Sequence, residues 1–307
     1  MPVTIAEGLA AIETLKSENI FFMTAERAAH QDIRPLQIAI LNLMPDKGRT
    51  EEQFLRLLAN TALQVEVTFL TTASYQSKHT AQAYLKGVYK TFADVEDLHY
   101  DGLIITGSPV EQMPFEAVAY WEELVQILDW AKRRVYSSLF VCWAAQAALY
   151  HYHAIAKHPL DEKLSGIYVH EVIAKDHTLV RGFDDCFLAP HSRHTAIDER
   201  AFEQHPNLVV IARSDEAGLY LGSSGDGRMI YVTGHSEYDR LTLDNEYRRD
   251  LGRGLNPKKP VNYYQDGRVS VSWRSHANLL FANWLNYHVY QATPYHLDQI
   301  ERMARQS

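Results

Sequence analysis

The sequence has few of the features that mark secreted, membrane or nucleic-acid-binding proteins. Its 307 residues include only two cysteines, Cys142 and Cys186, which are too few for a disulfide framework. The longest apolar stretches, such as residues 36–44, are interrupted by polar side chains and fall short of the ~20 residues of a membrane-spanning helix. The net charge is -8 and no Lys/Arg block offsets it, which argues against a nucleic-acid partner. The N-terminus has no basic segment followed by an apolar run, so we expect a cytoplasmic protein.

The chain also lacks internal repeats, low-complexity tracts and Pro/Ser-rich linkers. With 46% hydrophobic residues it is long enough to bury a sizeable core. We therefore expect a single domain over residues 1–307. Its parts would be an N-terminal extension (1–35), an α/β core (36–165), and a β-rich and helical completion of that core (166–307).

Strand candidates alternate with helix candidates along the first half of the chain. Strands are predicted at 36–43, 65–70, 102–106 and 138–141, and helices from a Thr50–Gln53 capping box onward and at 80–92, 117–134 and 143–152. This alternation predicts a doubly wound, mostly parallel α/β sheet with helices on both faces.

From Gly166 onward the pattern changes to short strand candidates with turn-rich connections, at 169–174, 208–212, 218–221 and 228–233. These predict an antiparallel extension of the sheet. A helix near Glu246 and a long aromatic helix at about 275–291 complete the chain.

Cys142 is a candidate nucleophile because it follows a buried strand and precedes a helix. A sharp turn at such a junction lifts the sulfur toward solvent, and the positive end of the helix favours the thiolate. Free cysteines are often buried, however, so the residue taken alone would more often belong to the core.

The segment His235-Ser236-Glu237 follows another predicted strand, and it favours a catalytic role for Cys142 over a place in the core. An imidazole there could take the thiol proton, and the carboxylate could hold the imidazole in one tautomer. Triad members meet in space rather than in sequence, so their separation along the chain is no objection. Backbone N–H groups at Trp143 and near Gly107 could stabilise an oxyanion. Together, the thiol, the imidazole, the carboxylate and the backbone N–H donors predict acyl chemistry.

Other polar segments have weaker interpretations. The histidine-rich segments at 151–153, 170–171 and 191–194 lack the spacing of a zinc site, so we expect no metal. Segment 191–194 is typical of a polar loop, in which Arg193, with Arg248 and Arg249, could clamp a substrate carboxylate. Surface ion pairs are the alternative for these arginines. Lys47 could contact a phosphate, but a solvated loop lysine is the simpler expectation.

A cysteine at a strand end with a later His-x-Glu is similar to the arrangement in class I glutamine amidotransferases, and it suits acyl transfer through a thioester equally well. More specific motifs cover nearly the whole chain, and together they resemble the homoserine O-succinyltransferase and O-acetyltransferase family. They are 31–36 (QDIRPL), 41–45 (LNLMP), 142–143 (CW) with Gln146, 189–195 (APHSRHT), 234–238 (GHSEY), 273–276 (WRSH) and 283–287 (NWLNY).

The resemblance implies a class I amidotransferase-like (flavodoxin-like) fold, an acyl-CoA donor without a further cofactor, a ping-pong mechanism and a homodimer. By this resemblance Cys142 carries the acyl group as a thioester, His235 is the general base and Glu237 orients it. It also implies that the amino-acid acceptor is contacted by Lys163, Ser192 and Arg249.

The same resemblance places Glu111 at the acyl-selecting position, where succinyl-using members have glycine. A glutamate there takes up space and repels a succinyl carboxylate, so we expect acetyl-CoA as donor. Ala144, Ala148 and Ser165 depart from the family pattern. L-homoserine is the expected acceptor, with L-serine as the alternative because the two differ by one methylene. Glutaminase activity and a non-catalytic binding protein are further alternatives.

Overall fold

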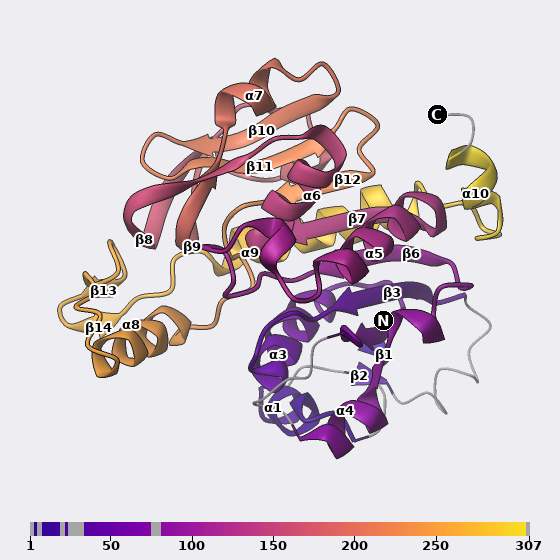
Figure 1. The fold of residues 1–307 in the computed structure, drawn as a ribbon, viewed down its shortest axis with the longest axis horizontal. Coiled ribbons are helices and arrows are strands. Elements are labelled where there is room, and N and C mark those ends of the chain that lie inside the picture. The colour runs from indigo at the N-terminus through magenta and orange to yellow at the C-terminus, as the bar shows by residue number, and fades with distance from the viewer. Residues whose placement is uncertain (1–2, 5–7, 19–21, 24–33, 75–80, 305–307) are drawn as a thin grey trace.

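The computed structural model describes residues 3–4, 8–18, 22–23, 34–74 and 81–304 (Figure 1). Residues 31–33 of the QDIRPL motif lie outside the described part. Within it, the main sheet has twelve strands in the order β2-β1-β4-β3-β6-β7-β12-β11-β10-β8-β9, with β5 beside β4. One continuous sheet therefore joins the predicted core to its predicted completion.

The parallel half of the sheet contains most of the strands that the sequence predicts. Its longer members are β3 (Leu36–Leu41), β4 (Val65–Leu70), β6 (Tyr100–Ile105), β7 (Val135–Val141) and β12 (Met229–Val232). Three short strands lie at the edge beyond β4. They are β1 (Val3–Thr4) and β5 (Tyr89–Lys90), which pair with β4, and β2 (Phe22–Met23), which pairs with β1. β3 and β6 are buried almost throughout, as strands covered on both faces must be.

Helices cover both faces of this sheet, which confirms the doubly wound α/β prediction. One face packs against α1 (Ala11–Ser17), α3 (Lys47–Leu58) and α9 (Arg274–Asn283), and the other against α5 (Trp121–Arg134) and α6 (Trp143–His153). Alternate side chains of β3 enter the two cores, Ile38 and Ile40 on one side and Ala39 and Leu41 on the other.

The second half of the chain adds an antiparallel extension, as predicted (Figure 1). It consists of β8 (Lys157–Val172), β9 (Cys186–Ile197), β10 (Leu208–Ser214) and β11 (Gly218–Ser224), and β11 joins it to β12. The strand predicted at 228–233 differs in part, because β12 pairs antiparallel with β11 but parallel with β7. The extension begins at Lys157, earlier than the predicted Gly166, because Pro159 and the charged residues around it are accommodated by a register shift between β8 and β9. Segment 191–194 lies within β9, so its prediction as a loop is wrong.

Two predicted helices differ from the structure. α3 begins at Lys47, because Asp46 caps it by accepting a hydrogen bond from the Arg49 amide, so Thr50 is not the cap. The helix predicted at 80–92 is shorter, since α4 (Gln82–Val88) gives way to β5 and a 3₁₀ turn, Phe92–Asp94. Thr80 lies outside the described residues.

The remaining elements complete the β-rich half and the C-terminus. They are two 3₁₀ turns (Phe115–Ala117 and Thr178–Val180), α7 (Glu199–Gln204), α8 (Thr242–Gly252), β13 (Tyr264–Gln265), β14 (Arg268–Val269) and α10 (Gln299–Ala304). α9 continues as a π-helical segment, Trp284–Tyr290, within the predicted aromatic helix. α8 lies beside the β13–β14 hairpin at one side of the molecule (Figure 1).

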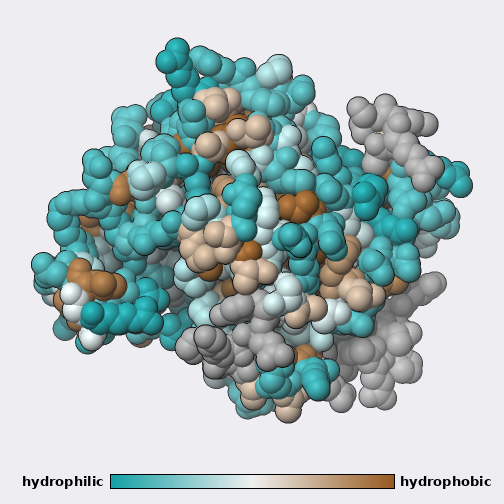
Figure 2. All heavy atoms as spheres, in the orientation of Figure 1, coloured by the Kyte–Doolittle hydropathy of each residue, from teal (hydrophilic) through white to brown (hydrophobic). Residues whose placement is uncertain are grey.

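The visible face of the molecule is mostly hydrophilic, with apolar side chains scattered in small groups (Figure 2). No helix in the described ranges is long and apolar enough to cross a membrane.

Candidate active site

Cys142 occupies a strained turn between β7 and α6. Its backbone has φ 51° and ψ -113°, a conformation that is costly for a residue with a side chain. Strand pairing holds it there, because its amide donates to the Val232 carbonyl of β12 at 2.7 Å. The side chain is 6% exposed and lies at the N-terminus of α6, where the helix dipole favours a thiolate. The predicted nucleophile elbow is therefore present.

His235 and Glu237 follow β12, the strand that pairs with β7. The His235 amide donates to the Pro190 carbonyl at 2.8 Å, which fixes the backbone. The His235 Nδ1 and Glu237 Oε1 atoms lie 2.7 Å apart, and a side-chain hydrogen bond joins His235 to Cys142. The structure thus brings the three predicted residues into one hydrogen-bonded row.

Electrostatics favour a charged imidazole in this row. Burial lowers the pKa of His235, but the negative charges of a Cys142 thiolate and of Glu237, with their hydrogen bonds, raise it well above its ordinary value. His235 and Glu237 are each at most 8% exposed, so water weakens these interactions little. The geometry is that of an activated thiol with an oriented base.

Gly107 and Trp143 lie where oxyanion donors are needed. A Cβ atom at Gly107 would lie 3.4 Å from the Cys142 Cβ and 3.5 Å from the His235 Cε1, so the loop after β6 passes directly beside the reacting groups. Trp143 is the first residue of α6, and its N–H therefore has no acceptor within the helix. Both backbone groups stay candidates for the oxyanion hole.

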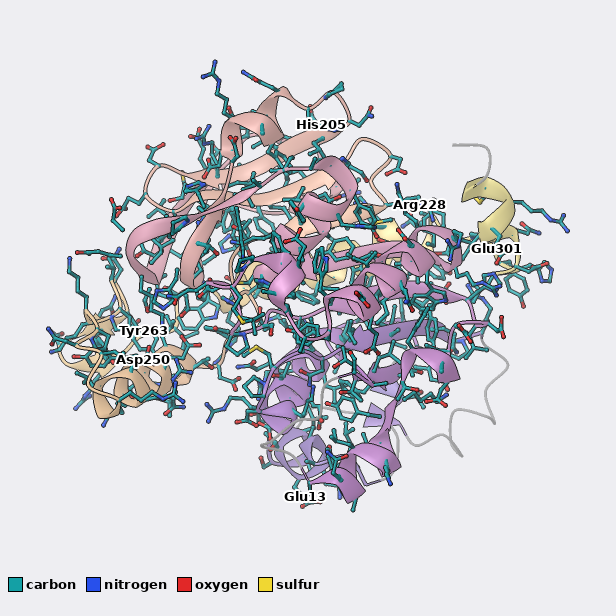
Figure 3. All side chains as sticks on the ribbon, viewed as in Figure 1. Glu13, His205, Arg228, Asp250, Tyr263 and Glu301 are labelled. Carbon is teal, nitrogen blue, oxygen red and sulfur yellow. The ribbon has the colours of Figure 1, made fainter. Side chains whose placement is uncertain are left out.

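The three residues expected to contact the acceptor lie in one cluster with two carboxylates. The Lys163 Nζ lies 2.9 Å from Asp250 Oδ2 and 3.7 Å from Glu246 Oε2, and the Arg249 Nε donates to Asp250 Oδ1 at 2.9 Å. The Ser192 hydroxyl donates to Glu246 at 2.5 Å. Burial raises the pKa of Asp250, but its bonds to the two cations hold it below the ordinary value. Asp250 lies on α8, in the lobe that also contains Tyr263 (Figure 3).

Tyr238 joins this acceptor cluster to the triad, which the sequence alone did not reveal. Its ring stacks on His235 with centroids 4.1 Å apart, and its hydroxyl donates to Glu246 Oε1 at 2.8 Å. Burial and the Glu246 charge raise the pKa of Tyr238 well above its ordinary value, so it stays a donor. Glu246 was likewise missed, although it stands three residues before Arg249, on nearly the same face of one helix.

The other two arginines are placed differently from Arg249. Arg193 is 4% exposed, and its Nη1 and Nη2 donate to the carbonyls of Thr195 and Ala217 at 2.8 and 2.5 Å. Both terminal nitrogens of Arg193 are therefore occupied, and they do not form the predicted bidentate clamp on a substrate carboxylate. Arg248 makes an exposed i, i+4 ion pair with Asp244 at 2.7 Å.

Glu111 lies in the loop after β6, on the same loop as Gly107. Its carboxylate lies 3.4 Å from the Thr195 hydroxyl, whose shorter hydrogen bond, at 2.9 Å, goes to Gln146 Oε1. The Lys157 ammonium donates to the backbone carbonyls of Glu111 and Met113, and the latter bond is 2.7 Å long. Lys157 thus fastens the loop that carries the expected acyl-selecting residue.

Lys47 is 5% exposed, so the expectation of a solvated loop lysine is wrong. It is the first residue of α3, and its ammonium donates to the Asn42 carbonyl. Burial lowers the pKa of Lys47 to about 8, and the Glu51 charge opposes this shift.

The histidines of the other segments have local partners. The Nε2 atoms of His170 and His191 lie 2.9 Å apart in the core, and His151 Nε2 lies 2.7 Å from Asp129 Oδ1. In the part of the chain that the structure covers, no three His, Cys, Asp or Glu residues are grouped to hold a metal ion.

Solved structures with a similar fold include two glutamine amidotransferases. One from Thermotoga maritima has a TM-score of 0.56 at 11% identity, covering 84% of this chain and 100% of that one. Another, from Methylobacillus flagellatus, has a TM-score of 0.53 at 13% identity, covering 86% and 99%. At such identities the likeness concerns the fold alone, and it confirms the class I amidotransferase-like prediction.

Sequence comparison is more specific. Residues 2–295 match the homoserine O-succinyltransferase family. The homoserine O-acetyltransferase of Lachnoclostridium phytofermentans is 54% identical over 301 residues, which cover 97% of this chain and 100% of that protein. That of Bacteroides thetaiotaomicron is 52% identical over 305 residues, covering 98% and 100%. The chain is therefore an acyltransferase that belongs to the homoserine O-succinyltransferase family.

Proposed function

We propose that the protein transfers the acetyl group of acetyl-CoA to the side-chain hydroxyl of L-homoserine, through a thioester on Cys142, in methionine biosynthesis. The observation that carries the proposal is the row of contacts from Cys142 through His235 and Tyr238 to Glu246, which sets an activated thiol beside a cluster of paired charges. The relatives named homoserine O-acetyltransferases support the choice of substrates.

In the first half-reaction the Cys142 thiolate attacks the acetyl carbonyl carbon while His235 holds the proton. Backbone N–H groups at Trp143 and Gly107 stabilise the oxyanion. The bond between that carbon and the CoA sulfur then breaks, and His235 gives its proton to the departing thiolate. The acetyl group is left on Cys142, and free CoA leaves.

In the second half-reaction His235 takes the proton of the homoserine hydroxyl, whose oxygen attacks the thioester carbon. The bond to the Cys142 sulfur breaks, which restores the thiolate beside a protonated His235. Glu237 holds the imidazole in one orientation and stabilises its positive charge in both halves.

The acceptor is an amino acid with one positive and one negative end. Glu246 would take its ammonium, and Arg249 with Lys163 would take its carboxylate. Ser192 bonds to Glu246 in the structure and would place the side-chain end of the substrate. Glu111 would exclude the longer, negatively charged succinyl group, so acetyl-CoA is the donor.

Steady-state kinetics test the proposal with acetyl-CoA or succinyl-CoA as donor and L-homoserine or L-serine as acceptor. We expect acetyl-CoA with L-homoserine to have the highest kcat/KM, with parallel double-reciprocal lines. A higher kcat/KM for L-serine would contradict the acceptor, and intersecting lines would contradict the ping-pong order. Ammonia release from glutamine without acyl transfer would replace the function with glutaminase activity.

A further inference from the structure

Arg193 is a buried cation without a carboxylate at ion-pair distance among the described residues. Its two terminal nitrogens donate to backbone carbonyls, and its Nε is buried without a partner. Neutral carbonyls do not cancel a full charge, and buried cations normally have an anion close by. The negative charge that balances Arg193 must therefore come from groups that lie beyond ion-pair distance.

The negative charges that act on Arg193 include two groups of the acyl site. Burial lowers its pKa, and the charges of Cys142, Glu199 and Glu111 oppose this, in that order. Glu199 is shared with the exposed Arg213, at 3.5 Å. The anions at the acyl site are thus the Cys142 thiolate, which is consumed when the thioester forms, and the Glu111 carboxylate.

Glu111 and Arg193 meet at Thr195. The Thr195 hydroxyl lies 3.4 Å from the Glu111 carboxylate and 2.9 Å from Gln146 Oε1, and the Thr195 carbonyl accepts from Arg193 Nη1 at 2.8 Å. Gly107, on the same loop as Glu111, lies beside Cys142, and Lys157 holds that loop against β8. Residue 111 therefore stands close to Arg193, on the loop that passes beside the reacting groups.

We infer that Arg193 is the residue that recognises the acyl group by charge. In this chain Glu111 supplies the opposite charge, so the protein needs none from its substrate and accepts acetyl. Where residue 111 has no side chain, the distal carboxylate of a succinyl group takes the place of the Glu111 carboxylate. This inference rests on the proposed function and adds to it the cation, Arg193, against which the charge at residue 111 is balanced.

The test is the variant Glu111→Gly with three donors: acetyl-CoA, succinyl-CoA and n-butyryl-CoA. Butyryl has the same chain length as succinyl but no charge. We expect kcat/KM for succinyl-CoA to rise at least about tenfold relative to acetyl-CoA, with no such gain for butyryl-CoA. Equal gains for succinyl and butyryl would overturn the inference, because cleared space alone would then explain them.

A second arm removes the cation. In the Glu111→Gly background, Arg193→Gln keeps hydrogen-bond donors for the carbonyls but loses the charge, so the preference for succinyl over butyryl should disappear. A retained preference would contradict the inference. Should that variant fail to fold, the kcat/KM values of the two donors in Glu111→Gly are compared directly. With Glu111 removed neither donor is repelled, so a higher kcat/KM for succinyl-CoA than for butyryl-CoA requires an attracting cation, and an equal or lower value would contradict the inference.

The two proposals fail in different ways. If the unmodified protein transfers no acetyl group from acetyl-CoA, the proposed function fails. If it transfers acetyl and Glu111→Gly gains butyryl as much as succinyl, only the role of Arg193 fails.

Discussion

At the scale of single residues, the proposed chemistry depends on the charge that Glu237 places behind His235. Burial alone lowers the pKa of His235, and the anions on either side reverse that shift. Glu237→Gln keeps the shape of the side chain but removes one of those anions. The imidazolium then loses support, and with it the thiolate of Cys142.

We expect Glu237→Gln to reduce kcat by about 10²- to 10⁴-fold and to slow alkylation of Cys142 by iodoacetamide at neutral pH. Glu203→Gln is the matched control, since Glu203 forms an exposed ion pair with Arg213. An alkylation rate unchanged from the unmodified protein would show that Glu237 does not support the thiolate.

The acceptor cluster gives a second prediction. Glu246 accepts from Ser192 and Tyr238, so Glu246→Gln keeps a polar side chain there but removes the charge offered to an ammonium. We expect KM for L-homoserine to rise about 10- to 100-fold, with a smaller change in KM for acetyl-CoA. Glu162→Gln, at a surface pair with Lys258, is the control. Equal rises in both KM values would contradict a role in the acceptor site.

Sequence could predict the triad but not every residue around it. Cys142 and His235 each follow a buried strand, so parallel pairing places them at one sheet edge. Tyr238 and Glu246 were missed because their roles come from contacts that no periodicity encodes, such as the bond from Ser192 to Glu246 across 54 residues. Lys47 was misjudged because burial of a lysine depends on side chains brought over it by folding.

At the scale of elements, β8 and the segment before β13 come unusually close together at Gly166. The backbone there has φ 152°, and a Cβ would lie 2.5 Å from backbone atoms of Val261. Two hydrogen bonds fix this approach, from Ile167 N to Val261 O at 2.8 Å and from Val261 N to Ser165 O at 2.9 Å. Gly166 stands three residues after Lys163 in β8, so this contact helps to hold Lys163 in the acceptor cluster.

Gly166→Ala should therefore destabilise the protein by about 1 to 3 kcal/mol and raise KM for L-homoserine. The comparison is Gly252→Ala in α8, where a Cβ meets nothing within 4 Å. Denaturant unfolding and steady-state kinetics measure the two effects. If both alanine variants were equally stable, the close approach at Gly166 would not matter energetically.

Helices and strands with a clear hydrophobic pattern could be predicted from the sequence. Strands buried on both faces and the amphipathic α5 stand out in the sequence, and their positions are nearly right. The start of the antiparallel extension was not predictable, because the residues of β8 near Pro159 are mostly exposed and do not alternate regularly between buried and exposed. Helix starts depend on single caps, and Asp46 and Thr50 both fit the rule.

At the scale of the whole molecule, one sheet with a core on each face links all parts of the chain. We propose that residues 1–307 unfold as one cooperative unit. Buried histidines then make stability depend on pH. Burial lowers the pKa of His170 to about 3 and of His153 and His177 to about 4, against an ordinary 6.5.

These histidines stay neutral in the folded protein and bind protons in the unfolded chain below pH 6.5. The free energy of unfolding should therefore fall as pH drops from about 6.5 toward 4, by up to a few kcal/mol for His170 alone. His170→Gln should flatten this dependence, whereas His158→Gln at an exposed position should not. Parallel pH dependences for all three proteins would contradict it.

The proposed function depends most on one step, in which Cys142 carries the acetyl group between donor and acceptor. The most direct measurement is rapid-quench mass spectrometry of the protein mixed with acetyl-CoA in the absence of an acceptor, followed by peptide mapping. We predict one acetyl group per chain, located on Cys142, absent in Cys142→Ala and discharged by L-homoserine at the rate of turnover. An unmodified Cys142, in a protein that nonetheless acetylates homoserine under the same conditions, would contradict this step.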